Sequence, residues 1–143
     1  MKVVNGKHIG VYGVIIKDEK IALIKKNGGG YHGKLDLPGG GMEYGESALD
    51  TLKRELMEEA GIEVNDAKLE NVYTNTIKWQ MTEDTIEDLY HIGIIYSVTS
   101  FQNELKKEAD GIDSDGSDWY EIKKLDLENL TPFARRVVEN YYK

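Results

Sequence analysis

The chain of 143 residues suits one domain, and a domain of that length can bury a core without help from disulfides or structural zinc. It contains no cysteine, which excludes thiol catalysis, thiolate metal sites and a disulfide framework. Its 18 basic and 26 acidic residues give a net charge of -8, which disfavours nucleic acid polymers but allows a phosphorylated small molecule if a divalent cation lies between the two.

Strand and loop signals dominate the first part of the chain. Loose alternation and β-branched residues predict strands over residues 8–16 and 21–24. A shorter strand is predicted over residues 34–37, where Pro38 halts it. The glycines at 39–41 then predict a loop.

A helix is predicted after this loop. Ser47 is suited to its N-cap, and Gly61 is placed to end it in a left-handed conformation. Apolar residues recur at helical spacing and form one stripe, which consists of Leu49, Leu52, Leu56 and Ala60. This stripe is expected to face the core.

The second half of the chain continues with strands and ends with a helix. Strands are predicted over 69–76 and 89–98, followed by a polar, Asp-rich loop over 101–118 and a short strand over 119–122. The final helix opens at Thr131-Pro132 and runs to about Tyr141. This order, with its hairpin-like connections, predicts an α/β domain in which helices pack on a mixed β-sheet.

Three glutamates of the first predicted helix share one face. Glu55, Glu58 and Glu59 stand at positions i, i+3 and i+4, beside the apolar stripe rather than opposite it. Like charges at that spacing destabilise a helix by roughly 0.2–0.5 kcal/mol per pair, and the helix dipole disfavours anions near the C-terminus. A solvated acidic face is the simpler interpretation of these residues alone. A hard divalent cation, Mg²⁺ or Mn²⁺, would instead compensate both penalties.

The residues before this helix favour the cation. Glycines at 39–41 allow the backbone to approach a ligand closely and to lend a carbonyl to a metal. Glu46 lies eight residues before Arg54, which places it at the helix entrance. Such a pair could be an ordinary surface salt bridge of little energetic value. Alternatively, it locks the loop to the helix and orients the carboxylates.

Together these residues resemble the Nudix box, GX5EX7REUXEEXGU, where U is a bulky aliphatic residue. Every defined position matches from Gly40 to Ile62, and the preceding Leu37-Pro38-Gly39 is also similar to the family. The resemblance implies a Nudix-like α/β/α sandwich with a mixed β-sheet. It further implies Mg²⁺-dependent hydrolysis of a diphosphate linkage in a nucleoside diphosphate derivative.

The resemblance also implies roles for individual residues. The positions that match the family's metal-binding and catalytic residues are Gly40, Glu46, Arg54, Glu55, Glu58 and Glu59. The carbonyl of Gly40 and the last three glutamates match the metal ligands, whereas Arg54 and Glu46 match an ion pair that positions the helix. The alternative is a non-catalytic Nudix-like module that senses a nucleotide. Such modules typically lose box carboxylates, so a complete box favours catalysis.

A further carboxylate is often recruited from outside the box in this family. The candidates in the Asp-rich loop are Asp113, Asp115 and Asp118, and Glu104 lies further away. A solvated loop explains the same residues equally well. The general base therefore stays unassigned.

Aromatic side chains are the candidates for stacking on a base or ribose. They are Tyr31, His32, Trp79, Tyr90 and His91, although aromatics in half-buried strands more often belong to the core. Tyr31 and His32 are favoured because they lie in a polar loop just ahead of the box. A lone histidine in a strand, such as His91, is usually a satisfied core residue.

The prediction of the substrate rests on one residue type that is absent from the segment after the box. The proline that marks ADP-ribose hydrolases, about fifteen residues beyond the box, is replaced by Asn75-Thr76. A nucleoside triphosphate, normal or oxidised, is therefore predicted ahead of ADP-ribose or another nucleotide sugar. The products would be the monophosphate and pyrophosphate.

The environment and partners follow from what the chain lacks. No apolar run approaches the roughly 18 residues of a membrane span, and the first residues lack the apolar core of a signal peptide. We therefore expect one domain over residues 1–143, in a soluble cytoplasmic protein that binds a small nucleotide and no membrane. It is expected to be a monomer or a homodimer.

Overall fold

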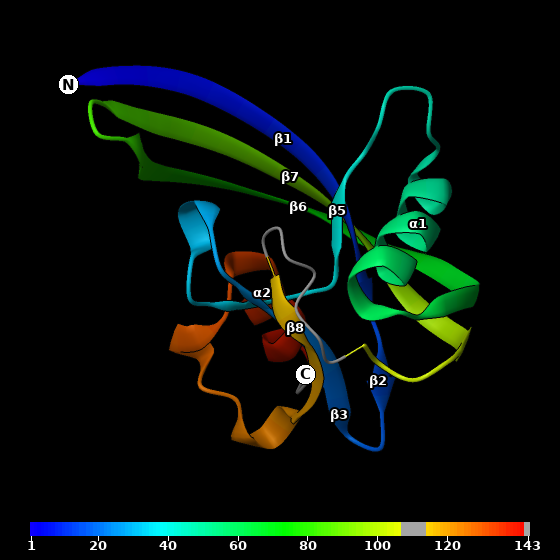
Figure 1. The fold of residues 1–143 in the computed structure, drawn as a ribbon. Coiled ribbons are helices and arrows are strands. Elements are labelled where there is room, and N and C mark those ends of the chain that lie inside the picture. The colour runs from blue at the N-terminus through cyan, green and yellow to red at the C-terminus, as the bar shows by residue number, and fades with distance from the viewer. Residues whose placement is uncertain (107–113, 142–143) are drawn as a thin grey trace.

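A computed structural model describes residues 1–106 and 114–141 of the chain (Figure 1). The strands and helices in order are β1 Lys2–Val14, β2 Ile16–Lys17, β3 Lys20–Lys26, β4 Leu35–Asp36, β5 Gly39–Gly41, α1 Ala48–Ala60, β6 Glu63–Thr82, β7 Thr85–Gln102, β8 Ser114–Glu121 and α2 Pro132–Tyr141. Three single-turn 3₁₀ helices are η1 Gly29–Tyr31, η2 Ile122–Lys124 and η3 Leu127–Asn129. Neither α1 nor α2 is long and apolar enough to cross a membrane, and no other helix of the described residues is either.

The larger sheet is mixed. Its strand order is β5-β1-β7-β6, with β1 parallel to β7 and the other two pairs antiparallel. Strands β1, β6 and β7 are longer than the sequence predicts, because their polar outer ends stay paired beyond the apolar runs. The pair Lys2–Thr85 and the pair Thr82–Thr85 lie at that outer end.

The smaller sheet contains β2, β3 and β4, and β8 pairs with β3. Strand β8 shows that the loop predicted over 101–118 was wrong at both ends, since β7 runs to Gln102 and β8 begins at Ser114. Polar Asp118 belongs to the strand because it pairs with buried Leu23 of β3. The loop predicted at 39–41 is also wrong, because these glycines form β5 against β1.

Helix α1 begins and ends where the sequence predicts. The Ser47 hydroxyl accepts a hydrogen bond from the Asp50 amide at 3.1 Å, and Gly61 ends the helix with φ of 71°. Leu52 and Leu56 are fully buried, whereas Leu49 in the first turn is 38 % exposed. Each fully buried leucine contributes roughly 1.5–3 kcal/mol, so these two anchor the helix to the sheet.

The two helices cover opposite faces of the larger sheet. Val11 of β1 packs with Leu52 and Leu56 of α1 on one face. Its neighbour Tyr12 points to the other face, where it packs with Phe133 of α2. Successive side chains of a strand alternate between faces. The arrangement confirms the predicted α/β/α sandwich with a mixed sheet.

Gly93 of β7 should be sensitive to substitution. A Cβ at this position would collide with the Phe133 ring, which packs against it. We expect Gly93→Ala to lower the free energy of unfolding by about 1–3 kcal/mol, as overpacked cores do. Urea denaturation of the variant and the wild type measures this loss of unfolding free energy. Gly28→Ala is the control, because no atom lies within 4 Å of a Cβ there, and equal losses would contradict this packing.

Candidate active site

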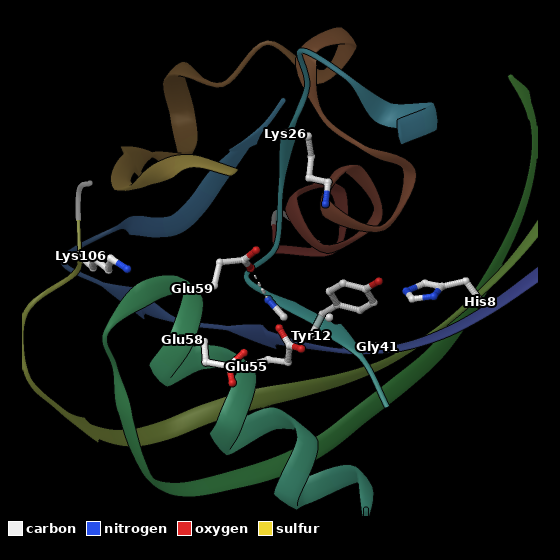
Figure 2. A pocket seen from close by; sticks show the side chains of 10 residues that line it. His8, Tyr12, Lys26, Gly41, Glu55, Glu58, Glu59 and Lys106 are labelled. Carbon is white, nitrogen blue, oxygen red and sulfur yellow. Dashed lines mark hydrogen bonds between the residues drawn. The ribbon is translucent and has the colours of Figure 1, made fainter. Parts of the chain in front are cut away.

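A cleft of about 480 Å³ brings the three predicted glutamates together with the glycine strand. Its lining residues are His8, Tyr12, Lys26, Gly39, Gly40, Gly41, Glu55, Glu58, Glu59 and Lys106. Figure 2 shows the glutamates along one side of α1, with Lys26 and Lys106 elsewhere around the cleft. Elements that are distant in sequence therefore place opposite charges around one cavity.

Arg54 ties the elements that build this cleft to one another. Its guanidinium makes two hydrogen bonds of 2.8 Å to the carboxylate of Glu46, one from Nε and one from Nη2. The same Nη2 donates to the Gly41 carbonyl at 3.0 Å, and Nη1 donates to Glu55 at 2.8 Å. Thr51 adds a hydroxyl donor to Glu46 at 3.0 Å. The loop, β5 and α1 thus share one charged hydrogen-bond network.

The network keeps its charges over a wide pH range. The hydrogen bond from Arg54 lowers the pKa of Glu46 to about 2. The same contact raises the pKa of Arg54. Both groups favour the charged form because each hydrogen-bonds its oppositely charged partner.

The three glutamates differ in how tightly they are held. Glu59 is only 6 % exposed and accepts a hydrogen bond of 2.8 Å from the Gly39 amide. The Glu55 side chain is 18 % exposed beside Arg54, whereas the Glu58 side chain is 62 % exposed. No three His, Asp or Glu side chains of residues 1–106 and 114–141 are gathered closely enough to hold a metal ion. The glutamates therefore border one cleft without converging on one point.

The donors around this cleft nevertheless suit a divalent cation. Carboxylate and carbonyl oxygens are the ligands that Mg²⁺ and Mn²⁺ prefer. Gly40 lies so close to Glu55 that an added Cβ would stand 2.5 Å from its Oε2. Only glycine leaves that space open between the β5 backbone and the carboxylate.

A second compartment of about 420 Å³ adjoins the first and shares His8, Tyr12 and Lys26 with it. Its remaining lining residues are Gly28, Gly29, Gly30, Tyr31, Asp36, Trp79, Leu89 and His91. Aromatic rings are concentrated here, while the acidic side chains of α1 line the first compartment. The cavity therefore has one charged half and one aromatic half.

His91 is the centre of the aromatic half. Its Nε2 lies 2.7 Å from the Tyr12 hydroxyl, and its Nδ1 lies 3.2 Å from the Tyr31 hydroxyl. The ring also packs against Phe133 with a centroid distance of 4.5 Å. Burial lowers the pKa of His91 to about 4, so the imidazole is neutral near pH 7 and bonds one tyrosine as donor and the other as acceptor.

Only some of the predicted aromatic residues reach the aromatic compartment. Tyr31 and Trp79 line the aromatic compartment, and His91 is buried in its wall, as expected of a satisfied histidine. His32 is exposed and lines neither compartment, since η1 turns its neighbour Tyr31 inward. Tyr90 is 43 % exposed on the opposite face, because adjacent strand residues point in opposite directions.

The predicted additional carboxylates are not brought into the cleft where the structure describes them. Asp118 is exposed on β8, and its carboxylate accepts a hydrogen bond from the Trp119 amide at 2.8 Å. Glu104 lines a different hollow, beside Trp119. Asp113 lies outside the described residues, and only the backbone of Asp115 is described, within β8.

Four lining residues of the first compartment were missed by the sequence analysis: His8, Tyr12, Lys26 and Lys106. His8 and Tyr12 stand four residues apart on β1 and so point to the same face. That alternation was available in the sequence, but which face meets the glycine strand was not. Lys106 had no local signal, because only the packing of distant segments brings it to the cleft.

Comparisons with known proteins agree on one family. A family model of the NUDIX domain matches residues 6–141. The chain is 30 % identical over 136 residues to an ADP-ribose pyrophosphatase of Methanocaldococcus jannaschii, a match that covers 93 % of this chain and 72 % of that protein.

Solved structures show the same fold. A MutT NUDIX hydrolase from Burkholderia pseudomallei superposes with a TM-score of 0.75 at 25 % identity, covering 93 % of this chain and 96 % of that one. A MutT protein from Bacillus halodurans gives a TM-score of 0.70 at 22 % identity, covering 92 % and 80 %. The likeness therefore extends over nearly the whole chain.

The buried His91 should make stability depend on pH. The pKa of His91 is about 4 in the folded chain and 6.5 in the unfolded chain. Between these two pH values the unfolded chain therefore binds a proton at His91 that the folded chain does not bind. Unfolding free energy should therefore fall as pH drops from 6.5 towards 4, by on the order of 2–3 kcal/mol.

The His91→Gln variant should lack this part of the pH dependence. Urea unfolding of both proteins at about pH 7 and about pH 4.5 gives the comparison. Burial also lowers the pKa of His8, and the charge of His8 lowers that of His91, so the same comparison is repeated in a His8→Gln background. Equal pH slopes for the two proteins would show that His91 does not titrate in this way.

Proposed function

The chain belongs to the Nudix family of hydrolases, and we propose that it hydrolyses a nucleoside triphosphate, normal or oxidised, to the monophosphate and pyrophosphate. Members of this family act on small nucleotide substrates and generally use a divalent metal. The observation that carries the proposal is the two-part cavity, in which the α1 glutamates and the β5 glycines adjoin an aromatic compartment. A polyphosphate fits the chemistry of one part, and a nucleobase fits the other.

The charged half is the proposed site of hydrolysis. Glu55, Glu58 and Glu59, with the carbonyl of Gly40, would hold a divalent cation, Mg²⁺ or Mn²⁺. Such a cation neutralises the charge that develops on phosphate oxygens during the displacement. The donor set supports this role, because α1 presents three carboxylates to the cleft and β5 presents its glycine backbone.

The protein's own groups would orient the reactants. Arg54 fixes Glu55 and the Gly41 backbone, and the Gly39 amide fixes Glu59. Lys26 and Lys106 bring positive charge to the same cleft, where ammonium groups form strong hydrogen bonds with phosphate oxygens. A cleft carboxylate then accepts the proton of the attacking water.

The aromatic half is the proposed nucleobase site. Its volume of about 420 Å³ falls within the usual range for small-molecule sites. The Trp79 Nε1 donates a hydrogen bond of 2.9 Å to Glu87. The Trp79 ring also lies against Gly30, where an added Cβ would stand 3.3 Å from the ring. A ring fixed in this way stacks on a base with little loss of side-chain entropy.

ADP-ribose is the second candidate substrate, because the Methanocaldococcus jannaschii relative is an ADP-ribose pyrophosphatase. The triphosphate stays the first proposal because Asn75-Thr76 replaces the expected proline. Asn75 also has a role in the aromatic half, since its side-chain amide donates to the Tyr31 hydroxyl at 3.2 Å.

A substrate panel tests the proposal directly. Purified protein with Mg²⁺ is incubated with normal and oxidised nucleoside triphosphates, ADP-ribose and other nucleotide sugars, and the products are identified by mass. A triphosphate should give the monophosphate and pyrophosphate, whereas ADP-ribose would give AMP and ribose 5-phosphate. Preferred turnover of ADP-ribose would replace the first proposal with the second.

Loss of one metal-binding carboxylate should abolish turnover. We expect Glu58→Gln and Glu59→Gln each to lower kcat by at least about 100-fold, because each removes an anionic ligand of the cation. Steady-state kinetics with excess Mg²⁺ measure the loss. Glu63→Gln is the matched control, since Glu63 is exposed on β6 and lines no part of the cavity. If either Glu58→Gln or Glu59→Gln turned over substrate like the wild type, that glutamate would not be a ligand of the catalytic cation.

Removal of the Trp79 ring should weaken substrate binding more than the chemical step. Stacking of a base on an aromatic ring contributes roughly 1–3 kcal/mol, so Trp79→Ala should raise KM by about 5-fold to 160-fold with a smaller change in kcat. Trp79→Phe keeps a ring and should recover most of the affinity. An unchanged KM in Trp79→Ala would place the base elsewhere.

A further inference from the structure

The larger sheet extends beyond α1 as a three-stranded blade of β1, β7 and β6 (Figure 1). Val11 and Ile94 pair across β1 and β7 and both pack on the α1 side, so alternate residues towards the blade's tip share that side. We call the apolar residues there the outer patch, which consists of Val3, Ile9, Val72, Ile86, Tyr90 and Ile92.

The outer patch is open to solvent. Val3 is 60 % exposed, Val72 52 %, Tyr90 43 % and Ile9 42 %. The opposite face of the same strands is different, since Trp79 and Leu89 are half-buried there and His91 is buried beside the cavity. The exposed apolar side chains form two groups, one at the tip and one nearer α1, with the polar row of Asn5, Asp88 and Lys78 between them. Exposed apolar groups rimmed by polar residues mark interaction surfaces.

We propose that the outer patch binds the outer patch of a second copy of this chain, so that the protein forms a twofold symmetric dimer. The charges around the patch support this partner. Among the strand residues on this face, the charged ones are Lys7, Lys78 and Asp88, which lie between the apolar groups and sum to +1 in a chain whose net charge is -8. This surface therefore lacks the acidic excess that would make two copies repel each other.

The same charges make the surface complementary to itself. Lys78 and Asp88 stand directly opposite each other on β6 and β7. A twofold axis through the blade places Lys78 of one copy near Asp88 of the other, as isologous interfaces require. A hollow of about 410 Å³ beside Tyr90 and Thr76 gives a protruding side chain of the partner a place to pack.

The size of the patch sets the expected affinity. Strand β6 runs about 27 Å from Val72 to Gln80 at roughly 3.4 Å per residue, and three strands are about 15 Å wide with their side chains. That gives on the order of 400 Å² per copy, below the roughly 800 Å² of a standard interface. The dimer is therefore expected to exchange with monomer at micromolar concentrations.

Packing through the outer patch leaves the cavity accessible. His8, Trp79 and His91 line the cavity from the other face of the same three strands. Both cavities of the dimer would then face away from the shared surface. Dimer formation and hydrolysis can therefore be tested separately.

Analytical ultracentrifugation of the full chain tests the proposal over about 5 to about 500 µM protein. We expect a reversible monomer–dimer equilibrium in the wild type. Tyr90→Glu should weaken it at least tenfold, because it buries a charge in an apolar contact. Tyr44→Glu is the matched control, since Tyr44 is fully exposed in the loop before α1 and belongs to none of the three strands of the blade.

A charge exchange tests the twofold arrangement. Lys78→Glu alone should weaken the dimer, and Lys78→Glu combined with Asp88→Lys should restore it. Val3→Glu repeats the test at the blade's tip if circular dichroism shows that Tyr90→Glu does not fold. A wild-type chain that stays monomeric throughout, or a Tyr44→Glu effect equal to that of Tyr90→Glu, would overturn the proposal.

Discussion

The ion pair between Arg54 and Glu46 is the contact on which the site depends. The guanidinium has five donors in a rigid plane, and this structure directs them to the entrance of α1, to the Gly41 carbonyl of β5 and to Glu55. A lysine has no such planar fork and cannot hold three partners in one geometry. Arg54, which is itself only partly buried, therefore sets the position of Glu55 relative to the β5 backbone, whereas the Gly39 amide holds Glu59.

The arrangement of the site explains how three neighbouring glutamates can serve a protein that binds a negatively charged nucleotide. Three glutamates at helical spacing repel one another, and a nucleotide would be repelled by all of them in the absence of a cation. The structure separates their roles by burial, since Glu59 is held by a backbone amide and Glu58 is largely exposed. Arg54 offsets part of the charge through Glu55. A bound divalent cation would offset the rest and join the phosphates to an otherwise repulsive surface.

One sheet supports both the proposed hydrolysis and the proposed dimer because its strands present different side chains on their two faces. Alternation places His91 inward, where it bonds two tyrosines, and places its neighbour Tyr90 outward. On the inward face, Phe133 of α2 and the η1 turn pack over the strands around the cavity. On the outward face beyond α1, no helix or turn of the described residues covers the strands. The same backbone thus supports a ligand cavity on one side and a candidate protein contact on the other.

Local sequence determined the elements whose signals are short in range. The Ser47 cap, the Gly61 end and the spacing of the glutamates on α1 were all correctly read, because capping and helical periodicity depend on neighbours a few residues away. The sequence did not predict the pairing of β5, the extent of β8 or the position of Lys106 at the cleft. Each of these depends on which distant segment supplies hydrogen bonds or an apolar surface, and that choice is made only when the whole chain packs.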